Sequence, residues 1–231
     1  MYIDVDENGQ YDEDTDTKVS TLASQIEITT IQKNYKFNLK EGFNFVSFPF
    51  VVAYDEYSTA AALLKQLNDV YGDVIYSISR FDGAWKVVGQ NVELYDNNDF
   101  QLLPGQGYVI KAKENVDIVI PGKPIKYESA QDSAPVSLFP GWNLIGIYGN
   151  NVKTYTAKSM LQDINAYEPV DFTANNVSKW ESDTQKYDGF QLEVESGVEM
   201  EYGFDYTIDI LKSYFVKVES GEGNWQPKLA E

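Results

Sequence analysis

Four segments of this chain match four later segments in the same order, and this internal duplication constrains the fold more than any other feature. Gly42–Ser47 (GFNFVS) aligns with Gly141–Gly146 (GWNLIG), 99 positions later. The other matched pairs are Tyr57–Asn68 with Tyr155–Asn165, Ser79–Asp82 with Ser178–Glu181, and Tyr108–Lys111 with Tyr214–Lys217. The offset stays between 97 and 106, and its changes fall where loops are expected, since loops tolerate insertions. Two copies are too few for a solenoid, so the pattern predicts two tandem domains of one fold.

Each copy has the same expected order of elements. The apolar run Phe43–Val51 indicates a strand buried on both faces. Ser58 or Thr59 in the first copy, and Thr156 in the second, are suitable N-cap residues before apolar residues at helical spacing. Turn residues then separate strand-like runs at 74–81, 85–88, 92–95, 108–112 and 116–120. We therefore predict an α+β, strand-rich fold with two tandem homologous domains, each a β-sheet with one helix after its first strand.

The expected boundaries follow from composition. An Asp-rich calcium-binding loop is expected over residues 1–18, the first repeat domain over 19–125, and the second over 136–231. Residues 126–135 are the expected linker, within a stretch rich in Pro, Gly, Ser and Lys. Ile26 and Ile28 alternate with polar neighbours, which favours an additional strand at the start of the first domain.

Composition excludes several classes of function. The chain has no cysteine and no histidine, so disulfides, zinc fingers, thiol nucleophiles and imidazole catalysis are ruled out. Asp and Glu number 36 against 18 Lys and Arg, and the formal net charge is −18. That charge repels nucleic acid and anionic lipid surfaces, and it favours divalent cations as counter-ions. No apolar stretch approaches the roughly 18 residues of a membrane span, so no membrane insertion is expected.

The N-terminal sequence DVDENGQYD, residues 4–12, places oxygen-bearing side chains at alternate positions beside Gly9. Ca²⁺ takes about six to eight oxygen ligands, and glycine allows the sharp turn that such a loop needs. The segment resembles the calcium loop of EF-hands, and more closely the shorter Asp-rich loops of dockerins and thrombospondin-type repeats. It departs from the EF-hand pattern at its end, where Thr15 stands in place of the bidentate Glu. The expected Ca²⁺ ligands are the side chains of Asp4, Asp6, Asn8 and Asp12, the carbonyl of Gln10, and Asp14 or Asp16 to complete the shell. A solvated acidic tail is the alternative.

The repeated blocks themselves resemble repeats of large extracellular bacterial proteins. The likeness rests on Gly141–Ile145 (GWNLI), Ser178–Trp180 (SKW) and Gly107–Val109 (GYV), and it covers most of residues 36–220. The first copy departs from the pattern, with Phe43 and Phe81 where Trp is typical. The resemblance implies a stalk or surface module, often joined to calcium-binding Asp-rich loops.

Aromatic residues raise a second possibility, since four Trp and 17 Tyr could form a platform on which carbohydrate stacks. The match of Phe81 with Trp180 favours packing instead, so Trp85, Trp142 and Trp180 are expected in the core and Trp225 is expected to be the most exposed Trp. Two carboxylates could serve glycoside hydrolysis, but no local motif marks such a pair. The turn at residues 104–107 precedes a strand rather than a helix, which argues against a phosphate-binding loop.

The leading functional prediction is a non-catalytic structural or adhesive module of a secreted or cell-surface protein, with calcium stabilising its N-terminal loop. The alternatives are a carbohydrate-binding module and a two-carboxylate glycosidase. The expected partners are neighbouring domains of a larger polypeptide and a cell-surface glycan or protein. The acidic loop begins only three residues after Met1, with no signal peptide between them, so we expect a fragment whose secretion signal lies elsewhere.

Overall fold

The computed structural model describes residues 2–3, 17–18, 32–52, 58–90, 98–125, 135–149 and 151–230. The chain divides into two compact units, residues 1–31 and 32–231. In the first unit β1 (Tyr2–Ile3) pairs antiparallel with β2 (Thr17–Lys18). The predicted calcium ligands from Asp4 to Asp16, and the predicted strand around Ile26 and Ile28, lie outside the described residues.

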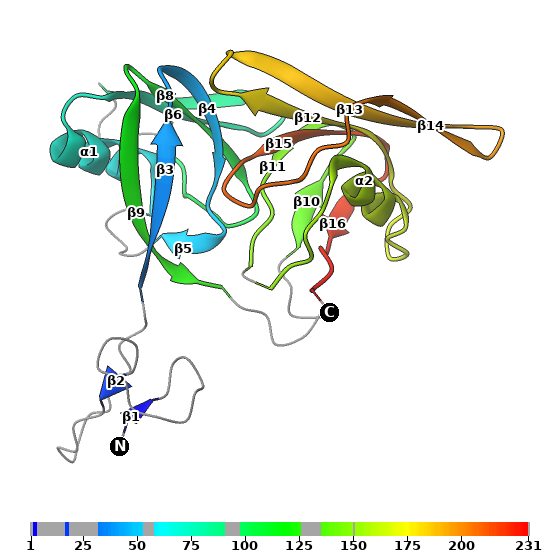
Figure 1. Ribbon diagram of the computed structural model, residues 1–231, viewed down its shortest axis with the longest axis horizontal. Coiled ribbons are helices and arrows are strands. Elements are labelled where there is room, and N and C mark those ends of the chain that lie inside the picture. Colours follow the sequence, from blue (N-terminus) through cyan, green and yellow to red (C-terminus); the bar gives the residue numbers. More distant parts are fainter. Residues whose placement is uncertain are drawn as a thin grey trace. The chain divides into compact units, whose positions relative to one another are not determined.

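The second unit contains both copies of the duplication, here called the first half (residues 32–125) and the second half (residues 135–230). The first half contains β3 (Lys33–Leu39), β4 (Gly42–Ser47), β5 (Phe50–Val52), α1 (Ala60–Tyr71), β6 (Ile75–Phe81), β7 (Trp85–Gly89), β8 (Gly107–Ala112) and β9 (Val116–Pro124). The second half contains β10 (Val136–Leu138), β11 (Gly141–Ile145), α2 (Ala157–Asn165), β12 (Thr173–Glu181), β13 (Lys186–Glu195), β14 (Val198–Gly203), β15 (Tyr214–Ser220) and β16 (Gly223–Trp225). The two halves lie side by side (Figure 1).

The described part of the second unit is mostly β, so the predicted α+β class with two tandem domains is wrong. It has 14 strands in four antiparallel sheets and only two short helices. A helix does follow the early strands of each copy, at the position that the sequence predicts. Those helices supply only one layer of a body that the sheets dominate, which is the reason that the class changes.

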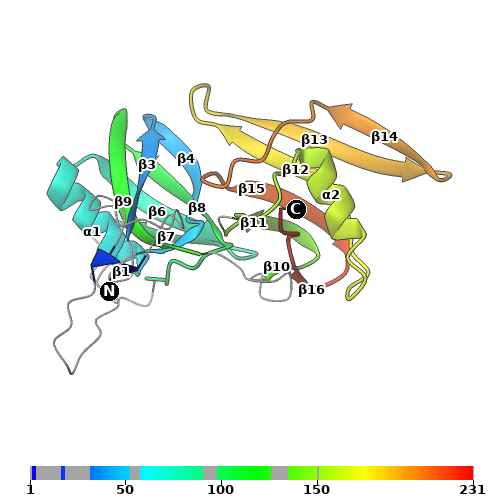
Figure 2. The same ribbon diagram turned by 60° about the horizontal axis from the view of Figure 1, so that its bottom comes forward.

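Both halves arrange their strands in one order. The larger sheet of the first half runs β4-β8-β6-β7, and that of the second half runs β11-β15-β12-β13-β14. A smaller sheet accompanies each, β3-β9-β5 in the first half and β10-β16 in the second. Figure 2 shows β10 and β16 side by side, and the β13–β14 hairpin projecting from the rest of its half. Among the described residues, the halves therefore depart from a common plan at β14, which only the second half has, and at β5, which only the first half has.

The helices begin where polar side chains satisfy their free backbone N–H groups. Thr59 accepts a hydrogen bond from the backbone N–H of Ala62 at 3.2 Å. Thr156 and Ser159 bond each other's backbone N–H groups in a reciprocal capping box. Among the described residues, neither helix is long and apolar enough to cross a membrane.

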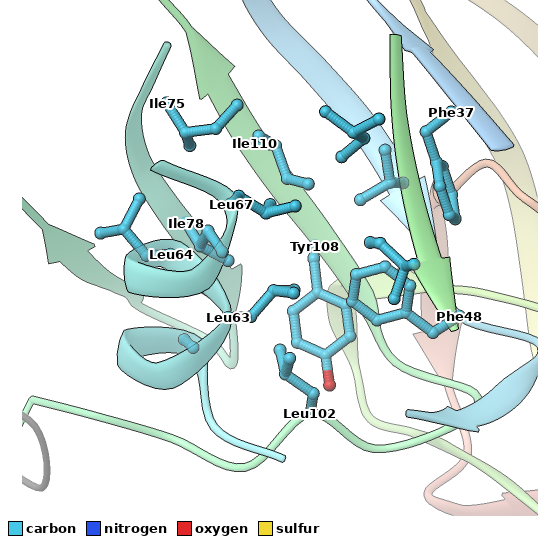
Figure 3. Close-up of a cluster of buried hydrophobic side chains, with 14 of the residues drawn as sticks. Phe37, Phe48, Leu63, Leu64, Leu67, Ile75, Ile78, Leu102, Tyr108 and Ile110 are labelled. Carbon is cyan, nitrogen blue, oxygen red and sulfur yellow. The ribbon is translucent and has the colours of Figure 1, made fainter. Parts of the chain in front are cut away.

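Each helix packs its apolar side on one face of the larger sheet. In the first half Leu63, Leu64 and Leu67 point from α1 toward the sheet (Figure 3).

Tyr108 lies at the centre of this core, stacked between Phe48 and Phe100 at ring-centroid distances of 5.3 and 6.1 Å. Its hydroxyl accepts a hydrogen bond from the Leu103 N–H at 2.6 Å, and burial raises its pKa above the usual range. Tyr214 occupies the same place in the second half, where its hydroxyl accepts a bond from the Asp209 N–H at 2.7 Å. The tyrosines thus fix the loop that precedes the last strand of each larger sheet.

The two halves meet through reciprocal backbone contacts. The N–H of Ser47 donates to the carbonyl of Leu211 at 2.9 Å, and the N–H of Gly146 donates to the carbonyl of Gly105 at 3.0 Å. Ser47 ends β4, Gly146 follows β11 at the equivalent position, and Leu211 and Gly105 precede equivalent strands. Contacts that repeat in this exchanged way define an approximate two-fold axis. This pairing is the physical reason that both halves form one unit. The division into separate domains at residues 125 and 136 stays a prediction.

The backbones approach very closely at this axis. A Cβ added to Gly146 would lie 1.7 Å from the Ser47 Oγ, so the pair has room for one side chain only. Isolated β-bridges repeat the exchange, at Val46–Lys212 and Gln106–Ile145. The junction is therefore a packed interface rather than a flexible connection.

Candidate functional site

The face of each larger sheet opposite its helix carries aromatic residues. Side chains alternate between the two faces of a strand, so residues next to core positions point to this second face. The strand registers give equivalent positions in the two halves, namely Phe43 and Trp142, Phe45 and Leu144, Phe81 and Trp180, Trp85 and Tyr187, and Val109 and Phe215. These residues gather around the two-fold axis, because the junction brings both second faces together.

Only part of this aromatic surface is buried. Phe45, Val109 and Leu144 form a small buried cluster, against which Phe81, Trp180 and Phe215 pack in partly buried positions. Trp85 and Trp142 remain 48% and 44% exposed, so the prediction that they lie in the core is wrong. Trp225, predicted to be the most exposed Trp, is 0% exposed, and its indole N–H donates to the buried carboxylate of Asp163 at 3.2 Å. β16 carries Trp225 into the core because it pairs with β10.

On one side of the axis the aromatic residues close against each other. Trp180 stacks on Phe45 with ring centroids 5.4 Å apart, and its indole N–H donates to the Phe43 carbonyl at 2.7 Å. Gln185, in the turn between β12 and β13, bonds both backbone groups of Phe43. Its side-chain oxygen accepts from the Phe43 N–H at 2.8 Å, and its amide donates to the Phe43 carbonyl at 3.1 Å. We call this arrangement the closed side.

On the other side of the axis the equivalent residues leave a hollow. The β6–β7 turn, residues 82–84, is one residue shorter than the β12–β13 turn, residues 182–185, and has no counterpart of Gln185. Phe81 replaces Trp180 and has no side-chain N–H to donate. A hollow of about 340 Å³ remains, here called the aromatic groove, and its lining is Phe81, Trp85, Trp142, Ser178, Tyr187 and Phe215.

The indoles of Trp85 and Trp142 both contact the Phe215 ring in an edge-on arrangement. Trp85 and Trp142 each lie 6.1 Å from Phe215 between ring centroids, with interplanar angles of 88° and 78°. Phe215 is partly buried, whereas both Trp side chains are about half exposed. Phe215 therefore forms the floor, and the two indoles stand nearly perpendicular to it.

A second hollow of about 400 Å³, here called the polar hollow, adjoins the groove and shares Phe81 and Trp142 with it. Its lining includes Arg80, Asp82 and Gln106. The Arg80 Nη2 lies 3.6 Å from the Asp82 Oδ2, and the guanidinium lies over the Phe100 ring at 5.0 Å. The Arg80 Nε is buried without a hydrogen-bond partner.

The equivalent hollow on the closed side has a different lining. It has a volume of about 300 Å³, and its charged residues are Lys36, Lys40, Glu181, Asp183, Asp209 and Lys212. Lys40 pairs with Asp183 at 2.9 Å. The two halves have thus diverged in charge at the same place in the fold.

The predicted functional residues have separate outcomes. The calcium ligands Asp4, Asp6, Asn8, Gln10, Asp12, Asp14 and Asp16 fall outside the described residues, and within the described ranges no group of three acidic side chains could hold a metal ion. Asp82 and Glu181, which the sequence places at matched positions, pair with Arg80 and Lys179. Sequence reasoning missed Tyr187 and Phe215. The alternation of Phe215 with the core residues Tyr214 and Val216 is the signal that could have placed it on the second face.

No family model, curated protein or solved structure matches this chain.

Proposed function

We propose that this chain is a non-catalytic adhesive module of a secreted or cell-surface protein, and that it binds a glycan in the aromatic groove. The observation that carries the proposal is the pair of half-exposed Trp side chains, Trp85 and Trp142, that line one hollow together with Phe215. The resemblance of the repeated blocks to extracellular repeats supports the location.

The chemistry of the groove favours a sugar ring. Indole rings offer flat, weakly polar surfaces, and the C–H groups on one face of a pyranose can pack against such a surface. Ligand sites are concave, mostly apolar and lined by a few polar groups, with volumes of about 300 to 1,000 Å³. The groove meets this description, with Ser178 and the Tyr187 hydroxyl as its polar groups.

Charge restricts the class of glycan. The lining of the aromatic groove contains no charged residue, and the whole chain carries a formal net charge of −18. A uronic acid or a sulfated sugar would meet this field without a cation in the groove to offset it. The proposed ligand is therefore a neutral glycan.

Calcium belongs to the proposal at the N-terminal unit. β1 and β2 pair Ile3 with Thr17, so the residues that flank the segment 4–16 lie beside each other. EF-hand loops lie between two helices, whereas this segment lies between two short strands.

Titration calorimetry with Ca²⁺ tests the site. We expect heat of binding at millimolar Ca²⁺ for the parent chain, and its loss in Asp6→Ala. No heat in the parent chain would remove calcium from the proposal.

The glycan proposal is tested with a glycan array, followed by titration of the best neutral ligand into matched variants. We expect Trp142→Ala to weaken binding at least about tenfold, because ring stacking accounts for most of the contact. The matched control is Phe43→Ala, at the equivalent position on the closed side, which should bind as the parent does. Absence of binding to every neutral glycan would overturn the proposal, and turnover of any glycoside would contradict its non-catalytic part.

A further inference from the structure

We propose that the polar hollow is a second sugar subsite, and that the ligand is a neutral, β-linked oligosaccharide that runs from the aromatic groove into it. The inference rests on the proposed function, because the aromatic groove supplies the first subsite. It adds the length of the ligand, the stereochemistry of its sugars and the residues that bind its hydroxyl groups.

The two hollows adjoin each other. Phe81 and Trp142 line both of them. Their volumes are about 340 and 400 Å³, and each alone reaches the size of a small-ligand site. A ligand that fills both must be longer than one sugar unit, so a disaccharide is the minimum.

The lining changes along this path from stacking groups to hydrogen-bonding groups. The Arg80 Nη2 and the Asp82 Oδ2 are 3.6 Å apart, beyond the roughly 2.7 to 3.2 Å of a direct N–H···O bond. Each group therefore keeps capacity for another partner. Sugar hydroxyls both donate and accept, so neighbouring hydroxyls can accept from the guanidinium and donate to the carboxylate.

Arg80 is held in place before any ligand arrives. Its side chain is 16% exposed and lies over the Phe100 ring, while its Nε is buried without a hydrogen-bond partner. The guanidinium is therefore fixed before binding, so a ligand hydroxyl that bonds its Nη2 costs little side-chain entropy.

The charges of the subsite favour a neutral ligand. Arg80 and Asp82 carry opposite charges and are the only ionised residues of the polar hollow's lining among the described residues. An acidic sugar would gain from Arg80 but would be repelled by Asp82 and by the net charge of the chain.

The half-exposed indoles favour sugars with equatorial substituents. A ring whose hydroxyl groups are equatorial presents the C–H groups of its face to an indole, whereas an axial hydroxyl would hold that face away. β-1,4-linked glucose has this property along the whole chain. The closed side cannot provide the same path, because Trp180 is bonded to Phe43 there. One oligosaccharide should therefore bind per chain.

The test is titration calorimetry with glucose, cellobiose, cellotriose and cellotetraose, and with oligogalacturonates of the same lengths. We expect one site per chain, no heat with the acidic series, and a rise of at least about tenfold in affinity from glucose to the longer neutral ligands. Asp82→Asn and Arg80→Lys should each lower the affinity for cellotriose about tenfold, as expected for one charge-assisted hydrogen bond. Neither should change the affinity for glucose.

Glu181→Gln, at the position equivalent to Asp82 on the closed side, is the matched control and should bind as the parent does. The Asp82 side chain is 60% exposed, so its variant should keep the melting temperature of the parent and report on binding alone. Equal affinity of the parent, Asp82→Asn and Arg80→Lys at every length would overturn the second subsite while leaving the groove intact. Binding that is insensitive to Trp85→Ala and Trp142→Ala would overturn the proposed function itself. Absence of heat with the whole neutral series, or tighter binding of the acidic series, would overturn the ligand class.

Discussion

The closed and open sides of the two-fold axis are built from equivalent strands, yet one is a packed contact and the other is a groove. On the closed side, a four-residue turn brings Gln185 and Trp180 onto the Phe43 peptide. On the open side, the three-residue turn has no counterpart of Gln185, and Phe81 has no side-chain N–H to donate, although the side chains of Phe43 and Trp142 are almost equally exposed at 43% and 44%. One residue of turn length and one indole N–H thus decide whether the backbone at this position is bonded across the axis.

This difference also shows how a duplicated fold can divide its tasks. The junction needs only one closed side to fix the relative position of the halves, since the backbone contacts at Ser47 and Gly146 already act on both sides. The second side is then free of that requirement. We infer that the groove exists because the fold is stable without closing it.

The junction common to both sides should be the most sensitive point. Gly146→Ala places a methyl group against Ser47, and we expect a loss of about 3 kcal/mol in the free energy of unfolding, as for overpacked cores. Ser47→Gly removes the obstacle, so the double variant should recover most of the loss. Urea unfolding of the four proteins of this cycle measures the effect. Gly89→Ala, with open space around it, is the control and should change little. Equal destabilisation of the single and double variants would contradict the close contact.

The two sides should respond oppositely to loss of a Trp. Trp180→Ala removes the stack on Phe45 and the bond to the Phe43 carbonyl, and we expect it to cost about 2 kcal/mol of stability, less than for a fully buried Trp. Trp142→Ala should cost less than about 1 kcal/mol, because half of its surface is already in water. Thermal and urea unfolding of both variants check this order, and a larger loss for Trp142→Ala would remove the distinction between the sides.

Substitutions of Gln185 should separate two smaller effects on stability, namely its hydrogen bonds to Phe43 and its left-handed backbone conformation. Its φ is 52°, a left-handed conformation that costs a non-glycine residue about 1 kcal/mol. Gln185→Ala loses the bonds to Phe43 and keeps this strain, so stability should fall by about 1 kcal/mol. Gln185→Gly loses the same bonds but relieves the strain, so it should lie close to the parent. Urea unfolding measures both variants. If their free energies of unfolding are equal, backbone strain at this turn does not contribute.

The smallest expected effect is electrostatic and belongs to the first half. Lys113 Nζ lies 2.6 Å from the Asp73 carboxylate, and this hydrogen bond is the main cause that lowers the pKa of Asp73. A carboxyl whose pKa is lower in the folded state stabilises the fold above its unfolded pKa of about 3.9. That contribution is lost as the pH falls through the folded pKa. In Lys113→Met, NMR titration should show the pKa of Asp73 moving up toward its ordinary value, whereas an unchanged pKa would show that Lys113 has no influence.

The sequence predicts local elements of this fold better than its assembly. Thr59 and Thr156 mark both helix starts because an N-cap is a local interaction. The same sequence does not show which face of a strand its helix will cover, so Trp85 and Trp142 were predicted in the core. Their exposure depends on how two segments about a hundred residues apart meet at the axis. The aromatic groove is a product of that meeting, which no local pattern encodes.

The calcium loop shows the opposite case. Its ligand pattern is local, and the sequence alone names every candidate from Asp4 to Asp16. Its stem, the β1–β2 pair, has only two residues on each strand, too few for the alternating pattern that predicts a strand. The sequence therefore indicates the chemistry of this unit but does not predict the β1–β2 pair.

The pairing of first and last strands has a mechanical consequence. Lys33 at the start of β3 pairs with Gly122 near the end of β9, and Val136 at the start of β10 pairs with Trp225 at the end of β16. The chain thus enters and leaves each half at the same end of an antiparallel pair. Tension applied across a half loads the hydrogen bonds one after another, as in opening a zipper, instead of shearing them together. We expect each half to yield at low force and to act as an extensible link rather than a rigid spacer.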